Sequence, residues 1–282
     1  MTFLITGATG NVGSLVVERL LEHGDRPRVF VRNARKALTL YADRVDVVVG
    51  DLTEMASLEA ALTGVDAFLL INTGPDIAAR DAAAAKTAMK AGVERLVKLS
   101  SMDSRLPVGT GVWHARGESA IRRSGITFTF VQPAGFMSNA LGWAASIKTD
   151  GVVRAPTGEG RIAFVHPEDI AAVAFEALTT RRFNQESLPI TGPRALSYSD
   201  MVATIGRAVG RSLEFHSISE EKARQSLLGN GDPEAVVDAH TSIWRAIREG
   251  RLATVTDNVE RAVGRPAIGF DRWVEQNAGA FR

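Results

Sequence analysis

Short apolar runs alternate with amphipathic or turn-rich stretches along the first half of the chain. The apolar runs are rich in β-branched and aliphatic residues, which is typical of buried strands. The stretches Ser14–Gly24 and Ala78–Val93 carry residues at helical spacing and contain a glycine where a helix would end. We therefore expect six strands, at residues 2–6, 28–31, 45–49, 67–71, 95–101 and 127–131.

This alternation predicts an α/β fold, in which a doubly wound parallel sheet has helices on both faces. The pattern loosens from about Pro156, where helix-like segments become more frequent. We expect the sheet domain at residues 1–155, with strands that return to it from about residues 162–193. Residues 156–282 are expected to form a smaller α/β C-terminal cap domain, interleaved with the first domain.

Composition and charge exclude several classes of function. With 33 Lys and Arg against 32 Asp and Glu, the chain has a formal net charge of +1 and no run of like charge, so we expect no nucleic-acid partner. The absence of cysteine removes disulfides, thiolate nucleophiles and cysteine-ligated zinc. The five histidines show no ligand spacing, so no metal is expected.

The N-terminal apolar run ends at Thr6 and Gly7, has no basic leader, and is followed by no stretch long enough to span a bilayer. We therefore expect a cytoplasmic protein with no membrane partner.

A glycine pattern, G-x-x-G-x-x-G, lies directly between the first predicted strand and the first predicted helix. This arrangement binds the pyrophosphate of a dinucleotide, because glycines allow close backbone approach and the helix N-terminus offers N–H groups. An ordinary glycine turn is the alternative, but the position at the start of a βα series favours a nucleotide site. The glycines are Gly7, Gly10 and Gly13, and the amides would come from Thr9, Asn11 and Val12.

The end of the second predicted strand distinguishes NADP(H) from NAD(H). An acidic residue here would favour NAD through the ribose 2′-hydroxyl, but this chain has Arg32, with Arg35 and Lys36 just beyond. A charge-assisted hydrogen bond of roughly 1.5–3 kcal/mol to a 2′-phosphate would favour NADP about ten- to a hundredfold. We therefore predict NADP(H) in preference to NAD(H), the alternative being that the cluster is a solvated helix start.

The ends of the other strands supply further cofactor-binding candidates. Asp51 follows the third strand, and its carboxylate would accept a hydrogen bond from the adenine or cap the next helix. The fourth strand ends beside the glycine loop at the switch point of a doubly wound sheet. The remaining candidates for the cofactor are Leu52, Ile71, Asn72, Thr73, Gly74 and Pro133.

Four segments together resemble the NmrA-like branch of the atypical short-chain dehydrogenases/reductases: "GATGNVG", "VRNARKA", "GDLTE" and "GITFTFVQPAGFMSN". Within that branch, the segments "WHARGESAIRRSGITFTFVQPAGFMSN" and "SIWRAIREGRLATVTDNVERAVGRP" are similar to those of bacterial NAD(P)H quinone oxidoreductases and triphenylmethane dye reductases. The resemblance covers nearly the whole chain. It implies a Rossmann-type domain that carries the nucleotide and a small C-terminal domain that closes over the nicotinamide.

The chain departs from typical family members at the proton donor. Neither of its two tyrosines begins the Tyr-x-x-x-Lys pair of these enzymes, so alcohol dehydrogenation by that mechanism is disfavoured. The corresponding helix instead has His114 and Glu118 on one face, where His114 would donate a proton and Glu118 would orient it or raise its pKa. The alternative is that His114 caps the helix and Glu118 faces solvent or Arg122. Ser100 and Ser101, at the fifth strand end, would contact ribose or substrate, or simply form a turn.

Hydride transfer to an acceptor that delocalises the electrons needs little proton assistance, so we expect an NADPH-dependent reductase of a quinone or a cationic dye. Reduction of an imine or an activated ketone is a further possibility, which would require a proton donor among His114, Ser100, Ser101 or water. A non-catalytic NAD(P)-sensing regulator of the NmrA type is the alternative function. We expect a small-molecule substrate as the binding partner. The sequence leaves open whether the protein forms a homodimer. The substrate would lie against an apolar wall, unless these residues are ordinary core: Trp113, Phe136, Met137 and Trp143.

Overall fold

The computed structural model describes all residues from Met1 to Arg282, and the chain divides into two compact units. The first unit consists of Met1–Arg105, Gly111–Gln132 and Pro167–Pro189, and the second of Leu106–Thr110, Pro133–His166 and Ile190–Arg282. The division differs from the predicted boundary at residue 155, because residues 106–110 and 133–155 already belong to the second unit.

A seven-stranded sheet of order β3-β2-β1-β4-β5-β6-β9 forms the centre of the first unit. Every pair from β3 to β6 is parallel, and the strand order reverses between β1 and β4, as in a doubly wound fold. The six predicted strands are all present. The strands are β1 (Phe3–Thr6), β2 (Arg28–Val31), β3 (Asp46–Val49), β4 (Ala67–Leu70), β5 (Arg95–Leu99), β6 (Thr127–Pro133) and β9 (Glu186–Ile190).

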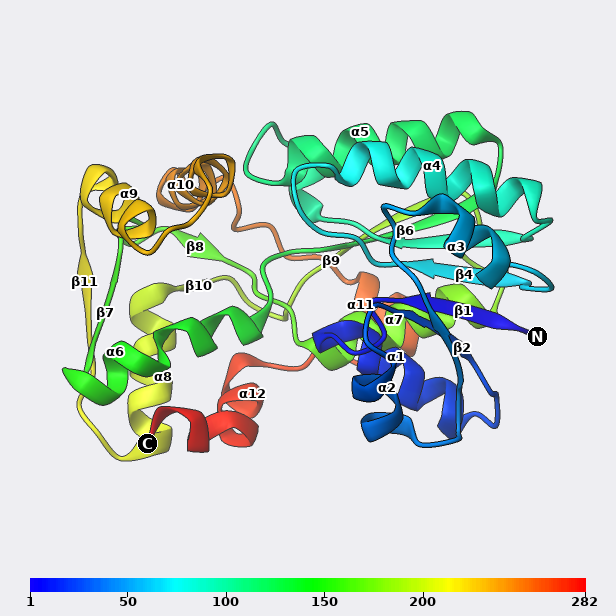
Figure 1. The fold of residues 1–282 in the computed structure, drawn as a ribbon. Helices are drawn as coiled ribbons and strands as arrows, with labels where there is room; N and C mark the ends of the chain where they lie inside the picture. The colour runs from blue at the N-terminus through cyan, green and yellow to red at the C-terminus, as the bar shows by residue number, and fades with distance from the viewer. The chain divides into compact units, whose positions relative to one another are not determined.

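Helices cover both faces of this sheet, with α3, α4 and α5 on one face and α1, α2 and α7 on the other (Figure 1). Apolar side chains of α3, α4 and α5 form one core with Phe68, Leu96 and Phe130 of the strands. Burial on both faces explains why the strands are continuous apolar runs. The helices are α1 (Asn11–Glu22), α2 (Ala34–Tyr41), α3 (Met55–Ala61), α4 (Ile77–Lys90), α5 (Gly111–Ser124) and α7 (Pro167–Thr179), with a 3-10 helix η1 (Met102–Arg105).

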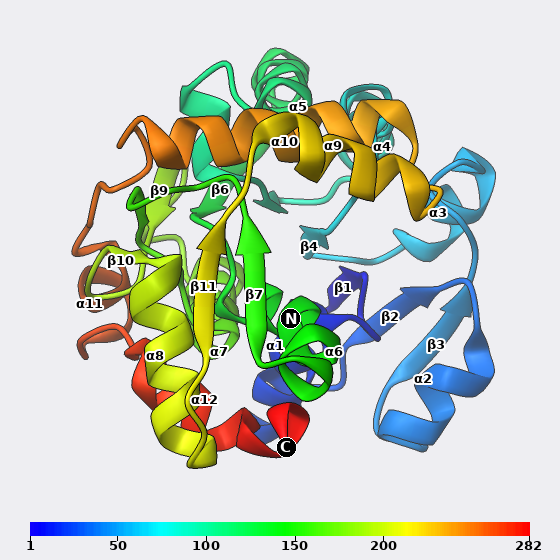
Figure 2. The same cartoon turned by 90° about the vertical axis from the view of Figure 1, so that its left-hand side faces the viewer.

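The second unit combines helices with two small sheets. The strands β7 (Val152–Ala155) and β11 (Glu214–Ser217) pair in parallel, and Figure 2 shows them side by side with α8 (Tyr198–Val209). The strands β8 (Arg161–Ile162) and β10 (Leu196–Ser197) form an antiparallel pair. The remaining elements are η2 (Met137–Trp143), α6 (Ala144–Thr149), α9 (Glu220–Gly229), α10 (Glu234–Arg248), α11 (Asn258–Val263), α12 (Phe270–Asn277) and η3 (Ala278–Phe281).

The prediction that strands return to the large sheet over residues 162–193 is only partly right. Only β9 joins that sheet, whereas β8 pairs with β10, since Ile162 and Phe164 pack into the core of the second unit. A local apolar run does not reveal which of two cores it will enter.

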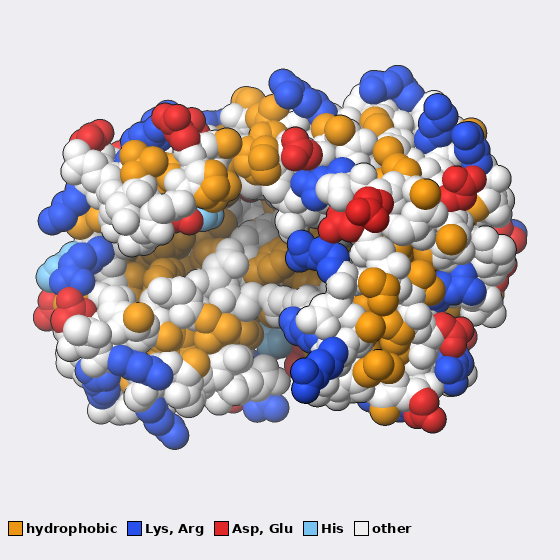
Figure 3. Space-filling view, viewed as in Figure 1, with side chains coloured by type: hydrophobic (Ala, Val, Ile, Leu, Met, Phe, Trp, Pro, Cys, Tyr) orange, Lys and Arg blue, Asp and Glu red, His pale blue; other side chains and the backbone are white.

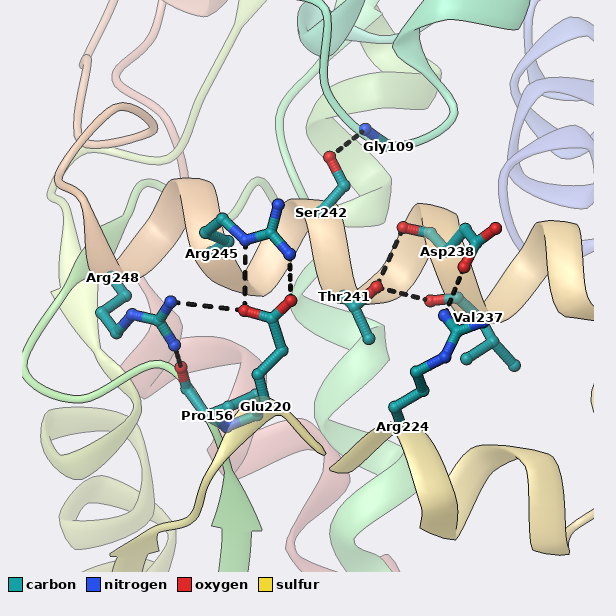
Figure 4. Close-up of polar contacts among 10 residues, drawn as sticks. All are labelled: Gly109, Pro156, Glu220, Arg224, Val237, Asp238, Thr241, Ser242, Arg245 and Arg248. Atoms are coloured by element: carbon teal, nitrogen blue, oxygen red, sulfur yellow. Dashed lines mark hydrogen bonds and ion pairs between the residues drawn. The ribbon is translucent and has the colours of Figure 1, made fainter. Parts of the chain in front are cut away.

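Ion pairs join α9 to α10 in the second unit (Figure 4). Glu220 accepts hydrogen bonds from Arg245 and Arg248, and Arg248 also donates to the Pro156 carbonyl at 3.2 Å. Further along the same helices, Arg224 pairs with Asp238. Because the side chains around Glu220 are partly exposed, each of its ion pairs contributes about 1 kcal/mol or less.

The surface carries mixed charge. On the face that Figure 3 presents, Lys and Arg side chains occur in several separate groups among neutral and acidic ones. No helix is both long and apolar enough to cross a bilayer.

Candidate functional site

The candidate cofactor site is the glycine loop between β1 and α1, at the point where the strand order reverses. Gly7 has a φ of +61°, and a Cβ at this position would lie 2.9 Å from Ile71 Cγ2. At Gly13 a Cβ would lie 2.2 Å from the Gly7 carbonyl oxygen, so only glycine lets α1 approach the loop this closely. Gly10 is less restricted, because its Cβ would meet only the Gly7 oxygen, at 3.2 Å. Gly7 and Gly13 therefore let the loop pack tightly between Ile71 and α1.

The start of α1 fits a bound anion. Gly10 caps the helix without a side-chain hydrogen bond, and the first turn carries no acidic residue. Asn11 and Val12 are its first two residues, and Thr9 precedes them in the loop. The positive end of the helix macrodipole and the N–H groups of the first turn thus meet at the glycine loop.

Two hydrogen-bonded contacts hold the loop in place. The Thr6 hydroxyl accepts from the Ile71 N–H at 2.7 Å and donates to the Ile71 carbonyl at 3.0 Å, which ties the end of β1 to the end of β4. On the other side, the buried Tyr41 hydroxyl of α2 donates to the Ala8 carbonyl at 2.5 Å. The hydrogen bonds of Thr6 and Tyr41 therefore hold both sides of the loop.

A basic cluster lies where β2 ends. Arg32 follows Val31 directly, Lys36 lies in the first turn of α2, and both are exposed with Arg35. Asn33 caps α2 by accepting from the Lys36 N–H at 3.2 Å, so Arg32 itself is outside the helix. None of the three cations makes an ion pair.

Asp51 adopts a local turn after β3. Its carboxylate accepts from the Thr53 N–H at 2.8 Å and from the Thr53 hydroxyl at 2.9 Å, and these bonds lower its pKa. Charge interaction with Arg32 is a smaller cause of the same shift. The proposed helix cap is wrong, because α3 begins at Met55 after Glu54 and makes no side-chain cap. Leu52 packs against the apolar core beneath.

In the segment after β4, the side chain of Asn72 points into the protein. Asn72 is buried, and its amide donates to Asp81 Oδ1 of α4 at 3.2 Å. The exposed Thr73 offers its carbonyl to Arg80, and Gly74 has a φ of +95°. Of this predicted stretch, Ile71 to Gly74, the Asn72 side chain is therefore engaged inside the protein, whereas Thr73 is exposed.

A buried ion pair lies under this edge of the sheet. Lys98 of β5 and Asp81 of α4 are both fully buried, with Nζ 2.6 Å from Oδ2. Asp81 also requires a glycine in α5, because a Cβ at Gly117 would lie 2.2 Å from Oδ2. Sequence reasoning missed both charged residues. The available signal was a lysine inside an apolar strand, which needs an opposite charge to be buried.

His114 lies in the first turns of α5 and is buried, with no hydrogen-bond partner for Nδ1. Burial lowers its pKa to about 3, and the charge of Lys98 acts in the same direction. The expectation that Glu118 raises this pKa is therefore wrong, and His114 is neutral at neutral pH. The imidazolium form that the prediction required is therefore the minor form at neutral pH.

This pKa shift predicts a pH dependence of stability. The unfolded state binds more protons than the folded state between about pH 3 and 6.5, so the free energy of unfolding falls as pH decreases below 6.5. His114→Gln should remove a slope of up to about 1.4 kcal/mol per pH unit. Urea unfolding at pH 7, 6 and 5 tests this prediction. If the free energy of unfolding depends on pH equally in the wild type and the variant, the prediction is contradicted.

Glu118 is the centre of a second buried network. Its Oε1 accepts from Ser100 Oγ at 2.5 Å, from Gln132 Nε2 at 2.8 Å and from Ser104 Oγ at 3.0 Å. Gln132 in turn accepts from Arg105 Nε at 3.1 Å. The alternative that Glu118 faces solvent or Arg122 is wrong. Glu118 thus joins α5 to β6 and to the segment that follows β5.

The predicted apolar wall is divided between the units. Trp113 is half-buried in α5 of the first unit, whereas Phe136, Met137 and Trp143 belong to the second. Met137 is 2% exposed and packs into the core of that unit. Trp143 lies against Tyr198, with ring centroids 4.9 Å apart. Pro133 ends β6 and is buried.

These features fit a dinucleotide. Gly7 and Gly13 allow the close packing of the loop against Ile71 and α1, and the helix behind the loop has no side-chain cap. A doubly wound sheet with a glycine loop at its switch point defines a Rossmann-type nucleotide-binding protein. Residues 7–181 match the NAD(P)H-binding family. The chain belongs to this family, as an NmrA-like member of the atypical short-chain dehydrogenases/reductases, and is an NAD(P)H-dependent reductase.

Relatives extend over the whole chain. An NAD(P)H azoreductase from Xenophilus azovorans is 38% identical over 282 residues, covering 99% of this chain and 98% of the relative. The structure of an NADPH-dependent quinone oxidoreductase from Escherichia coli with NADPH is 25% identical, with a TM-score of 0.88 and coverage of 98% and 99%. The triphenylmethane reductase of Citrobacter sp. is also 25% identical, with a TM-score of 0.87 and coverage of 99% and 100%.

Proposed function

We propose that this reductase uses NADPH in preference to NADH and transfers hydride to a conjugated small molecule such as a quinone, an azo dye or a triphenylmethane dye. The observation that carries the cofactor preference is the exposed, unpaired Arg32 at the end of β2. The acceptor class rests on the similarity to the azoreductase, the quinone oxidoreductase and the dye reductase.

The sheet order supports an assignment of the cofactor residues, because a dinucleotide crosses the switch point of a doubly wound sheet. On this proposal Arg32, Lys36 and Asp51 bind the adenosine half. The glycine loop would bind the pyrophosphate, and the ends of β4, β5 and β6 would bind the nicotinamide half. Bound NADPH would supply the hydride.

The protein contributes position rather than covalent chemistry. The Glu118 network holds Ser100 and Ser104 on the segment after β5. A quinone or a cationic dye delocalises the incoming electron pair, so orientation and exclusion of water provide most of what such a reaction needs. In place of the predicted catalytic roles, we propose that Ser100 and Glu118 act as positioning residues and that His114 is a neutral residue of the same helix as Glu118.

Charge reversal at Arg32 tests the cofactor preference. Arg32→Asp should weaken NADPH binding by about tenfold, the low end of the range for a charged hydrogen bond because the side chain is exposed. NADH binding should change little or improve, since a carboxylate accepts from the ribose 2′-hydroxyl. Fluorescence titration of the wild type and the variant with NADPH and with NADH measures the ratio of the two dissociation constants.

Lys148→Asp makes the same charge change on an exposed residue of α6 and serves as the control. If both variants weaken NADPH binding equally, the effect is one of net charge and the assignment of Arg32 fails.

The activity itself is tested by loss of NADPH absorbance with purified protein against quinones, azo dyes, triphenylmethane dyes, imines and ketones. Saturable turnover of one acceptor class supports the proposed function. Tight NADPH binding without turnover across the panel would instead support the alternative, an NAD(P)-sensing regulator.

A further inference from the structure

A pocket of about 300 Å³ lies at the amino ends of β5 and β6, within the first unit. Arg95 and Thr127 are the first residues of these strands and are partners in the parallel register. This edge of the sheet is opposite to the edge with the glycine loop, because the strands from β3 to β6 all run in one direction. The proposed reductase function makes no use of this pocket. Its lining consists of Glu94, Arg95, Thr127, Arg181 and Asn184.

Arg95 is the most buried residue of the lining, with 3% of its surface exposed. Its Nε donates to the Leu178 carbonyl at 3.1 Å. The terminal nitrogens have no oxygen acceptor within hydrogen-bonding distance, since Nη2 meets the Met1 sulfur at 3.3 Å and Nη1 lies 3.9 Å from Glu94 Oε2. A guanidinium buried to this extent normally has its donors paired, because unpaired burial is costly. Burial is also the main cause that lowers the pKa of Arg95.

The charges of the lining do not balance. The Glu94 carboxylate lies 2.9 Å from Arg181 Nη2, so a single acid serves two cations. Asp66 also acts on the charge of Arg95, but it lies outside the lining and accepts from the Thr2 N–H at 2.7 Å. The lining therefore carries one positive charge in excess, and the guanidinium of Arg95 keeps donors that no protein oxygen occupies.

Asn184 adds an unused acceptor to the same pocket. Its side-chain oxygen is buried and has no hydrogen-bond partner. The backbone on both sides of it is tied to β6, because the Gln185 N–H donates to the Phe128 carbonyl at 2.7 Å and the Thr129 hydroxyl donates to the Phe183 carbonyl at 2.8 Å. The unused acceptor and the unused donors thus lie on segments that are already held in place.

We propose that this pocket binds a small hydroxycarboxylate. A carboxylate accepts two parallel hydrogen bonds from a guanidinium, which suits the terminal nitrogens of Arg95. A hydroxyl group of the same molecule donates to Asn184 Oδ1. A single negative charge matches the excess charge of the lining, whereas Glu94 opposes a doubly charged anion such as phosphate. The pocket volume is at the small end of the range for ligand sites.

Gluconate is the probe for this site, because it joins one carboxylate to several hydroxyl groups. Isothermal titration calorimetry should show saturable binding with a dissociation constant of about 1 mM or lower. Hexanoate keeps the carboxylate without the hydroxyls, and sorbitol keeps the hydroxyls without the charge, so each should bind at least about tenfold more weakly. Saturating NADP⁺ is present throughout, so that gluconate does not occupy the glycine loop.

Two variants test the pocket without removing the buried cation. Asn184→Asp replaces the acceptor with a second acid, and Arg181→Met frees Glu94 to oppose the anion. Each variant should weaken gluconate binding by about tenfold or more. Arg182→Met is the matched control, because it removes the same charge from an exposed neighbour that does not line the pocket. It should change the affinity less than about twofold.

Thermal unfolding gives a second readout. Gluconate should raise the melting temperature of the wild type and of Arg182→Met, and should raise it less in Arg181→Met and Asn184→Asp, because a ligand stabilises the folded state in proportion to its occupancy. Arg95→Met removes the guanidinium itself and should abolish binding. If Arg95→Met does not fold, the Arg181 and Asn184 variants still decide the question.

Several results would overturn the proposal. One is the absence of saturable binding at gluconate concentrations up to about 10 mM. Others are hexanoate binding as tightly as gluconate, or inorganic phosphate binding more tightly. Equal loss of affinity in Arg181→Met and Arg182→Met would show an effect of net charge rather than of the pocket. None of these measurements uses reductase turnover, so a failure of the proposed function would leave them unchanged.

Discussion

Gly13→Ala is expected to weaken NADPH binding by about a hundredfold or more and to destabilise the fold. The added Cβ would lie 2.2 Å from the Gly7 oxygen and 2.7 Å from its carbonyl carbon, so α1 and the loop must separate. Separation would remove two or more charge-assisted N–H contacts to the pyrophosphate, of about 1.5–3 kcal/mol each. Overpacking of this kind costs about 1–3 kcal/mol of stability. Calorimetric titration and urea unfolding measure the two effects.

Two further alanine substitutions make this a graded series. Gly10→Ala should disturb binding more than stability, because its Cβ meets the Gly7 oxygen at 3.2 Å. Gly142→Ala is the control, since no heavy atom lies within 4 Å of the added Cβ. Unchanged NADPH affinity in Gly13→Ala would show that the glycine loop does not hold the cofactor.

Breaking the buried pair of Asp81 and Lys98 is expected to be the most destabilising single change in the first unit. Asp81→Asn or Lys98→Met should each lower the free energy of unfolding by about 3–5 kcal/mol, because one charge is left buried without its partner. The double variant should be more stable than the sum of the two single changes implies. Urea unfolding of all four proteins gives the coupling energy directly.

An exposed pair provides the comparison. Arg26 and Asp46 lie 2.8 Å apart with side chains 60% and 49% exposed, so Arg26→Met should cost about 1 kcal/mol or less. If Lys98→Met costs no more than Arg26→Met, the buried pair is not a principal contributor to stability. Removal of Lys98 should also raise the pKa of His114, since its charge is one cause of the lowered value.

Much of the first unit was predictable because its signals are local. The period of the apolar runs and the glycines at turns located six strands. The glycine loop could be found as well, because all of its residues are close together in the sequence. The end of β2 was placed to the residue, so Arg32 lies where the sequence predicted.

The polar networks were not predictable because they join distant segments. Glu118 and Gln132 are 14 residues apart, and only the packing of α5 beside β6 brings them together. The helical spacing of His114 and Glu118 predicted that they share one face of α5, and the structure shows that both are buried. The spacing did not show that Lys98 lies near His114 or that Ser100 lies near Glu118. Burial then reversed the expected pKa shift of His114.

The interleaving of the two units limits how this chain can be divided or rearranged by recombination. A fragment that ended at residue 155 would lack α7, which packs on α1, and β9, which completes the edge of the sheet beyond β6. The apolar side chains of α1 would then face water, and β6 would become an open edge prone to pairing with other chains. Exchange of acceptor-binding segments between relatives therefore has to preserve the returning segment Pro167–Pro189, so this architecture favours change by substitution over change by domain shuffling.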